Sequence, residues 1–174
     1  GRVLFRSERA SGFGLKLRVV AKADRSERTR QKLQDMGVLP VPDLNSLIDE
    51  CDILSLHVPS VPETRGMVNT EFLEKLRPRA ILINTARGDL IDEEALVRAL
   101  ESKSLRVGLD VYCDEPSSGC SEFRSVLANH KSVYGTHHIG ASTDQAQTAV
   151  TEGVLEIVSA FTQGKILNCV HIAD

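Results

Sequence analysis

Ionisable side chains follow several short apolar runs of this sequence, at the points where strands are expected to end. They are Asp24, Arg87, Asp110 and His138, and Glu115 lies in the loop just after Asp110. Right-handed crossovers between parallel strands deliver the strand ends to one edge of a sheet, so we expect these groups to converge there. A histidine at such an edge can exchange protons with a ligand near neutral pH.

These residue types suit hydride transfer between a 2-hydroxy acid and its 2-keto acid. His138 can donate a proton to the carbonyl oxygen or remove it from the hydroxyl group. Glu115 can stabilise the protonated imidazole, and the planar fork of Arg87 can bind a substrate carboxylate and polarise the neighbouring carbonyl. Taken singly, each has a simpler interpretation: a loop histidine, an ordinary loop carboxylate and a surface ion pair. Their shared position at strand ends favours the chemical one.

Two aspartates at strand ends fit a dinucleotide. Asp24 follows the strand expected at 17–21. At the end of the second strand of a dinucleotide-binding fold, an acid in this place accepts hydrogen bonds from the adenosine ribose of NAD. It would repel a 2′-phosphate, although Lys22 and Arg25 beside it leave NADP as an alternative. Asp110 either holds the nicotinamide carboxamide or caps the end of its strand.

The elements that must position these groups alternate along the chain. Strands are expected at 17–21, 38–39, 53–56, 80–83, 107–109 and 132–134, and helices at 26–36, 43–48, 69–76, 92–100 and 144–162. This alternation predicts an α/β fold with a doubly wound parallel sheet. The unbroken apolar run at 80–83 predicts a strand that is buried on both faces.

Composition excludes several classes of protein. A net charge of −3 and a pI near 6.0 argue against nucleic acid as a partner. No apolar run is long enough to span a membrane. The four cysteines are widely spaced and form no C-x-x-C pair, so we expect no metal site and a reducing, cytoplasmic location.

Three motifs resemble the signatures of the D-isomer-specific 2-hydroxyacid dehydrogenases. They are Asn84-Thr85-Ala86-Arg87-Gly88, Leu109-Asp110-Val111-Tyr112 with Glu115-Pro116, and His138-Ile139-Gly140-Ala141-Ser142-Thr143. The resemblance implies a Rossmann-type NAD-binding domain, a small 2-hydroxy acid as substrate, and a homo-oligomeric full-length protein. It implies Arg87, Glu115 and His138 as catalytic residues. It implies NAD contacts at Asp24, Val58, Pro59, Thr85, Ala86, Asp110, Gly140 and Ala141.

Within this family, the sequence from His138 to Gln147 is most similar to the D-3-phosphoglycerate dehydrogenases. That likeness implies oxidation of 3-phosphoglycerate to 3-phosphohydroxypyruvate in serine biosynthesis. Another enzyme of the family, acting on glyoxylate, hydroxypyruvate, lactate or formate, remains an alternative. A second alternative is an NAD(H)-sensing binding protein like the corepressors that share the fold.

The beginning of the chain departs from the family pattern. Residues 1–7 fit no helix signal and are expected to be a foreign leader, and 8–10 are expected to form the last turn of a helix. The NAD-binding domain is then assigned to 8–164, and 165–174 begin the return to a substrate-binding domain. The family's first strand and G-x-G-x-x-G loop are missing, so the strands at 17–21 and 53–56 should each lose a partner. We therefore expect a fragment, truncated at both ends, that is weakly folded and inactive alone.

Overall fold

The computed structural model describes residues 2–116 and 123–168, which fall into two units, 1–136 and 137–174. The strands are β1 (Arg18–Val20), β2 (Leu39–Val41), β3 (Ile53–Leu56), β4 (Ile81–Asn84), β5 (Arg106–Leu109) and β6 (Val133–Gly135). The helices are α1 (Arg2–Ser11), α2 (Glu27–Asp35), α3 (Leu44–Ile48), α4 (Thr70–Lys75), α5 (Glu93–Lys103) and α6 (Asp144–Thr162), with a 3₁₀ turn at Gly88–Leu90.

Local capping signals set the helix boundaries. The side chains of Ser26, Asn69 and Asp92 accept hydrogen bonds from backbone N–H groups in the first turns of α2, α4 and α5. Such caps satisfy donors that have no partner inside the helix. Beyond α2, Gly37 has a φ of +69°, which glycine adopts without steric cost. The three starts and the end of α2 lie within about one residue of the predicted positions, whereas α5 runs to Lys103, beyond the predicted end at 100.

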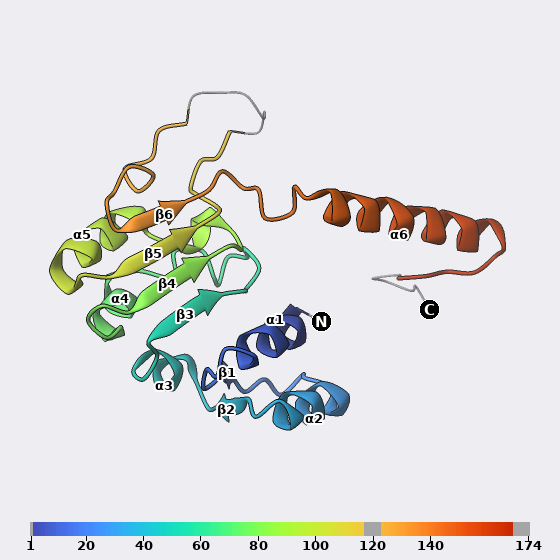
Figure 1. Ribbon diagram of the computed structural model, residues 1–174, viewed down its shortest axis with the longest axis horizontal. Coiled ribbons are helices and arrows are strands. Elements are labelled where there is room, and N and C mark those ends of the chain that lie inside the picture. Colours follow the sequence, from blue (N-terminus) through green and yellow to red (C-terminus); the bar gives the residue numbers. More distant parts are fainter. Residues whose placement is uncertain (1, 117–122, 169–174) are drawn as a thin grey trace. The chain divides into compact units, whose positions relative to one another are not determined.

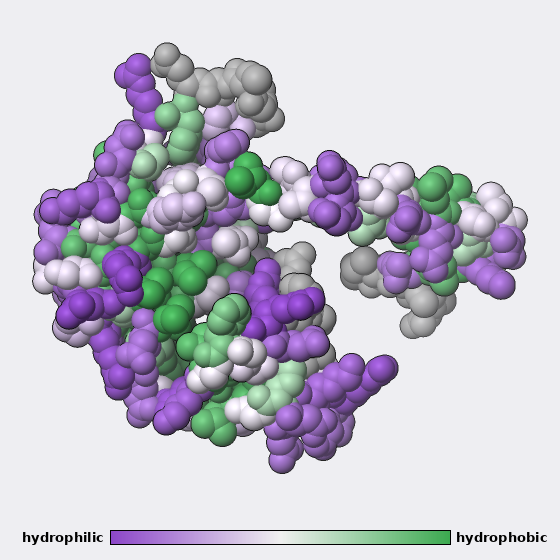
Figure 2. All heavy atoms as spheres, in the orientation of Figure 1, coloured by the Kyte–Doolittle hydropathy of each residue, from purple (hydrophilic) through white to green (hydrophobic). Residues whose placement is uncertain are grey.

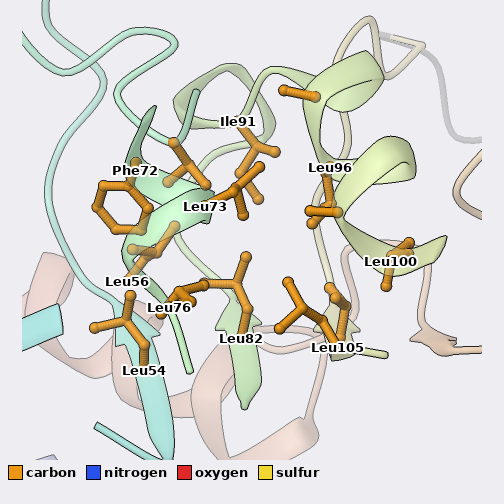
Figure 3. Close-up of a cluster of buried hydrophobic side chains, with 14 of the residues drawn as sticks. Leu54, Leu56, Phe72, Leu73, Leu76, Leu82, Ile91, Leu96, Leu100 and Leu105 are labelled. Carbon is orange, nitrogen blue, oxygen red and sulfur yellow. The ribbon is translucent and has the colours of Figure 1, made fainter. Parts of the chain in front are cut away.

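The larger sheet has the strand order β3-β4-β5-β6, with all neighbouring strands parallel (Figure 1). Its buried residues alternate along each of β3, β4 and β5, so one face forms the core. Leucines of this face meet apolar side chains of α4 and α5 (Figure 3). The prediction that 80–83 is buried on both faces is wrong. Ile81 and Ile83 are only half-buried, because α4 and α5 cover the opposite face, where Leu82 lies.

β1 and β2 form a separate two-stranded parallel sheet. Among the described residues, β1 pairs only with β2, and β3 pairs only with β4. This separation confirms the predicted loss of a strand partner for 17–21 and for 53–56. β2 passes through Pro40, opposite Val19, although the sequence suggested that this proline would limit the strand. An edge position tolerates the missing N–H group of proline.

The N-terminal helix corrects one expectation. α1 runs from Arg2 to Ser11, so the chain is helical well before the predicted last turn at 8–10. Ser7 on this helix is buried, and the Nη1 atom of Arg6 is buried as well. The segment predicted to fit no helix signal is therefore continuous with the helix that follows it.

The second unit consists mainly of α6. This helix begins at Asp144, as the sequence predicted; Thr143 caps it, and Gly164 follows its end with a φ of +73°. Hydrophobic and hydrophilic residues are intermixed on the surface of α6 (Figure 2). The exposed large hydrophobic residues of this helix are Val150, Val154, Leu155, Ile157, Val158 and Phe161. Within 2–116 and 123–168, no helix combines the length and hydropathy that a bilayer crossing requires.

Candidate functional site

A cavity of about 330 Å³ lies at the carboxyl ends of β3 and β4. Its walls come from the loops after the two strands and from α1: Arg6, His57, Val58, Pro59, Ser60, Thr85, Ala86 and Arg87. The first unit thus brings five of the predicted site residues together, from Val58 to Arg87. Among the described residues that line the cavity, none is acidic and two carry a guanidinium group. This lining suits an anionic ligand.

Asn84 shapes the loop that carries Arg87. Its side chain is fully buried at the end of β4; the Nδ2 atom donates to the carbonyl oxygen of Arg87 at 2.8 Å, and Oδ1 accepts from the N–H of Ala86 at 3.0 Å. The guanidinium of Arg87 donates to the carbonyl oxygen of Ala86 at 2.6 Å. The amide at the strand end therefore holds the loop in the conformation that presents Thr85, Ala86 and Arg87 to the cavity.

The Arg87 loop and the Glu115 loop are in backbone contact. A Cβ atom on Gly88 would lie 1.9 Å from the carbonyl oxygen of Tyr112 and 2.5 Å from the nitrogen of Cys113. Only glycine permits this approach. Glu115 then folds back on the same loop, and its Oε1 atom accepts from the N–H of Tyr112 at 2.6 Å. Arg87 and Glu115, far apart in the sequence, are consequently on adjoining loops.

Glu93 holds both sides of the loop that carries Glu115. From the first turn of α5, Oε1 accepts from the N–H of Cys113 at 3.0 Å, and Oε2 accepts from the hydroxyl of Ser125 at 3.3 Å. Burial, with Glu93 nearby, raises the pKa of the Cys113 thiol to about 11, so this thiol stays protonated. The sequence analysis did not predict these contacts of Glu93.

Asp110 lies at the end of β5 and is 7% exposed. The hydroxyl of Thr136, at the end of β6, donates to its Oδ1 atom at 2.6 Å. The sequence placed Asp110 at this edge of the sheet but gave no role to Thr136. This hydrogen bond joins the ends of β5 and β6, at the edge of the sheet where Arg87 follows β4.

Asp24 lies apart from the residues that line the cavity. It is exposed, in a turn closed by a hydrogen bond from the N–H of Arg25 to the carbonyl oxygen of Lys22 at 3.2 Å. Lys22 and Arg25 line a second, more apolar cavity of about 810 Å³ between the two-stranded sheet and α2.

His138, Gly140 and Ala141 belong to the second unit, so they are not among the residues that the first unit brings together. His138 is exposed and has a φ of +58°, in the left-handed region that favours glycine. The N–H of Ser142 donates to the carbonyl oxygen of Ile139 at 2.9 Å, which closes the turn before α6.

His57 is a site residue that the sequence analysis passed over. Its Nε2 atom lies 2.9 Å from the hydroxyl of Ser55, while Nδ1 is buried and has no hydrogen-bond partner among the described residues. The pKa of His57 is lowered to about 4, mainly by burial and to a smaller extent by the nearby positive charge of Arg6. The ring is therefore neutral at pH 7. The sequence feature that could have identified His57 as a site residue is its position at the end of a predicted strand.

The residues of the cavity fit a dinucleotide. The buried nitrogens of His57 (Nδ1) and Arg6 (Nη1) lack partners among the described residues, and an unpaired buried polar atom is costly. A ligand with hydroxyl and phosphate groups would satisfy both. Within the described ranges, no group of three or more histidine, cysteine or acidic side chains is arranged to hold a metal ion.

Comparisons with known proteins point to one family. Residues 6–140 match the family described as D-isomer specific 2-hydroxyacid dehydrogenase, NAD binding domain. The chain is 43% identical over 117 residues to a D-3-phosphoglycerate dehydrogenase of Synechocystis, covering 66% of this chain and 20% of that protein. It is 35% identical over 161 residues to a glyoxylate reductase of Thermococcus litoralis, covering 92% of this chain and 46% of that protein.

A solved structure gives the same result. The D-lactate dehydrogenase of Aquifex aeolicus, complexed with NAD and lactic acid, superposes with a TM-score of 0.73 at 30% identity, covering 91% of this chain and 49% of that one. The chain therefore spans about half or less of the length of these relatives.

Proposed function

The chain belongs to the D-isomer specific 2-hydroxyacid dehydrogenase family through its NAD-binding domain, and from this we propose that the full-length protein is an NAD-dependent oxidoreductase that interconverts a D-2-hydroxy acid and its 2-keto acid. The observation that carries the proposal is the cavity at the ends of β3 and β4. It gathers Val58, Pro59, Thr85, Ala86 and Arg87, which the motif resemblance assigned to cofactor and substrate.

We assign each remaining predicted residue a part in holding the cofactor. In this proposal, Asp24 accepts hydrogen bonds from the adenosine ribose, and Asp110 accepts from the carboxamide of the nicotinamide. Gly140 and Ala141, in the loop that carries His138, are proposed as further NAD contacts. NAD, when bound, supplies the hydride acceptor for the oxidation.

The chemistry then falls to three side chains. The guanidinium of Arg87 binds the substrate carboxylate through two parallel N–H donors and holds the carbon–oxygen bond in place. An imidazole nitrogen of His138 takes the proton from the substrate hydroxyl oxygen during oxidation and returns it to the carbonyl oxygen during reduction. The carboxylate of Glu115 stabilises the imidazolium that forms.

For the substrate, we propose 3-phosphoglycerate, which would place the protein in serine biosynthesis, in the cytoplasm, as a homo-oligomer. The identity to a protein named D-3-phosphoglycerate dehydrogenase supports this choice. Glyoxylate or hydroxypyruvate is the second candidate, because a glyoxylate reductase is similar over 92% of the chain.

The test is a substrate panel on the full-length protein. NADH formation is followed at 340 nm with NAD and 3-phosphoglycerate, D-glycerate, glycolate or D-lactate. The proposal requires turnover of at least one D-2-hydroxy acid and, in its finer form, the highest kcat/KM with 3-phosphoglycerate. Binding of NADH without turnover of any of them would instead support a sensing protein.

A further inference from the structure

The hydroxyl of Thr136 makes its shortest contact with a buried carboxylate. It lies 2.6 Å from Oδ1 of Asp110 and 3.4 Å from the carbonyl oxygen of Leu109. A hydroxyl donor at 2.6 Å from a carboxylate is in the range of a charge-assisted hydrogen bond. At 7% exposure, Asp110 depends on such donors, because a buried charge without partners is strongly disfavoured.

This bond is not needed to pair the strands. The backbone N–H of Thr136 already donates to the carbonyl oxygen of Leu109 at 2.9 Å, which continues the β5–β6 ladder. The preceding residue, Gly135, makes room for the side chain of Tyr112: a Cβ there would lie 2.0 Å from the hydroxyl oxygen of Tyr112. The side chain of Thr136 is therefore available to act on the orientation of Asp110.

We propose that Thr136 is a positioning residue for nicotinamide recognition: its hydroxyl fixes the Asp110 carboxylate in the orientation that accepts the carboxamide N–H of the dinucleotide. The inference rests on the proposed function, which gives Asp110 that contact. A carboxylate held by a hydroxyl on the neighbouring strand does not need to reorganise when the ligand arrives, and this preorganisation favours binding.

The experiment compares two dinucleotides in the full-length protein. In 3-acetylpyridine adenine dinucleotide, an acetyl group replaces the carboxamide and removes its N–H donors. The measured quantity is the ratio of its Kd to the Kd of NAD, both from isothermal titration calorimetry. One hydrogen bond to a charged acceptor corresponds to a ratio of about ten or more in the wild type.

Thr136→Val keeps the shape of the side chain and removes the hydroxyl, so the ratio should fall about fivefold or more, towards one. Thr136→Ser keeps the hydroxyl and should restore the wild-type ratio. The matched control is Thr151→Val on α6, whose hydroxyl bonds only to the carbonyl oxygen of Gln147 among the described residues; its ratio should not change. Thr136→Ala replaces the valine variant if the latter does not fold.

Asp110→Ala, which removes the acceptor, separates the two ways in which the inference can fail. If the ratio falls towards one in this variant but keeps its wild-type value in the Thr136 variants, the positioning role is overturned and the proposed function stands. If Asp110→Ala also keeps the wild-type ratio, Asp110 does not bind the carboxamide, and both the cofactor assignment and the inference fail. A general loss of stability in Thr136→Val would raise the Kd of both dinucleotides by the same factor and leave their ratio unchanged. This outcome would also overturn the inference.

Discussion

Gly88→Ala tests whether the contact between the Arg87 and Glu115 loops is essential for activity. The added Cβ would lie 1.9 Å from the carbonyl oxygen of Tyr112 and 2.0 Å from its carbonyl carbon, whereas real Cβ contacts stay at 3.0 Å or more. The two loops must therefore move apart by about 1.1 Å or more to make room for this atom. Both partners are backbone atoms, so no side-chain rotation can relieve the clash.

Two effects follow from this separation. Overpacking of this kind costs about 1–3 kcal/mol of folding free energy, which lowers Tm by several degrees. Misplacement of a substrate-binding group by about 1 Å can lower kcat/KM about 100-fold. Because Arg87 would bind the substrate in the transition state, we expect kcat to fall as well as KM to rise.

The assay is steady-state NADH formation by the full-length protein, together with thermal unfolding. Gly108→Ala on β5 is the matched control, since its Cβ would meet only Cγ1 of Ile83, at 3.9 Å, and that variant should keep its activity. Activity of Gly88→Ala within about twofold of the wild type would show that the contact between the two loops is not essential. An equal loss of activity in Gly108→Ala would show that the loss does not come from this contact.

Three further predictions concern stability and reactivity. Lys103→Met should lower the free energy of unfolding, measured with urea, by about 1–3 kcal/mol, because the ammonium group of Lys103 donates to the last carbonyl groups of α4. The control Lys75→Met removes only exposed contacts and should lower it by less than about 1 kcal/mol. Equal losses in the two variants would contradict this prediction. Burial lowers the pKa of His57 in the folded state from 6.5 to about 4, so the unfolded state binds more protons than the folded state between these pH values. The stability of the folded protein should therefore fall as the pH drops from 6.5 to 4. His57→Gln should flatten that part of the curve of Tm against pH, and an unchanged slope would show that His57 does not cause it. Cys113, with a pKa of about 11, should be about one part in a thousand thiolate at pH 8 and react slowly with iodoacetamide, as measured by peptide mass spectrometry; alkylation at the rate of an ordinary free thiol would contradict the burial of this group.

The sequence predicted the elements well because their signals are local. Ser26, Asp92 and Thr143 cap helices that begin within one residue of the predicted starts, since a cap depends only on the residues next to it. The burial of β4 was predicted less well. An apolar run shows that a strand prefers burial, but it does not show which face the helices cover.

The candidate site was also predicted in part, for the same reason. Motif resemblance predicted Val58, Pro59, Thr85, Ala86 and Arg87 as site residues, and the fold gathers these residues in one cavity. The supporting residues were missed because their contacts span long stretches of chain: Glu93 reaches Cys113, 20 residues away, and Thr136 reaches Asp110, 26 residues away. A glutamate in a first helical turn and a threonine after a strand have common structural uses, so type and position alone did not reveal these partners.

In the proposed function, His138 moves the substrate proton while other residues hold NAD. The turnover and the NAD affinity of His138→Asn, measured in the full-length protein, test this division of roles. We expect a kcat at least about 100-fold below the wild type, with the Kd for NAD changed by no more than about threefold. A variant that oxidises D-2-hydroxy acids at close to the wild-type rate would contradict it.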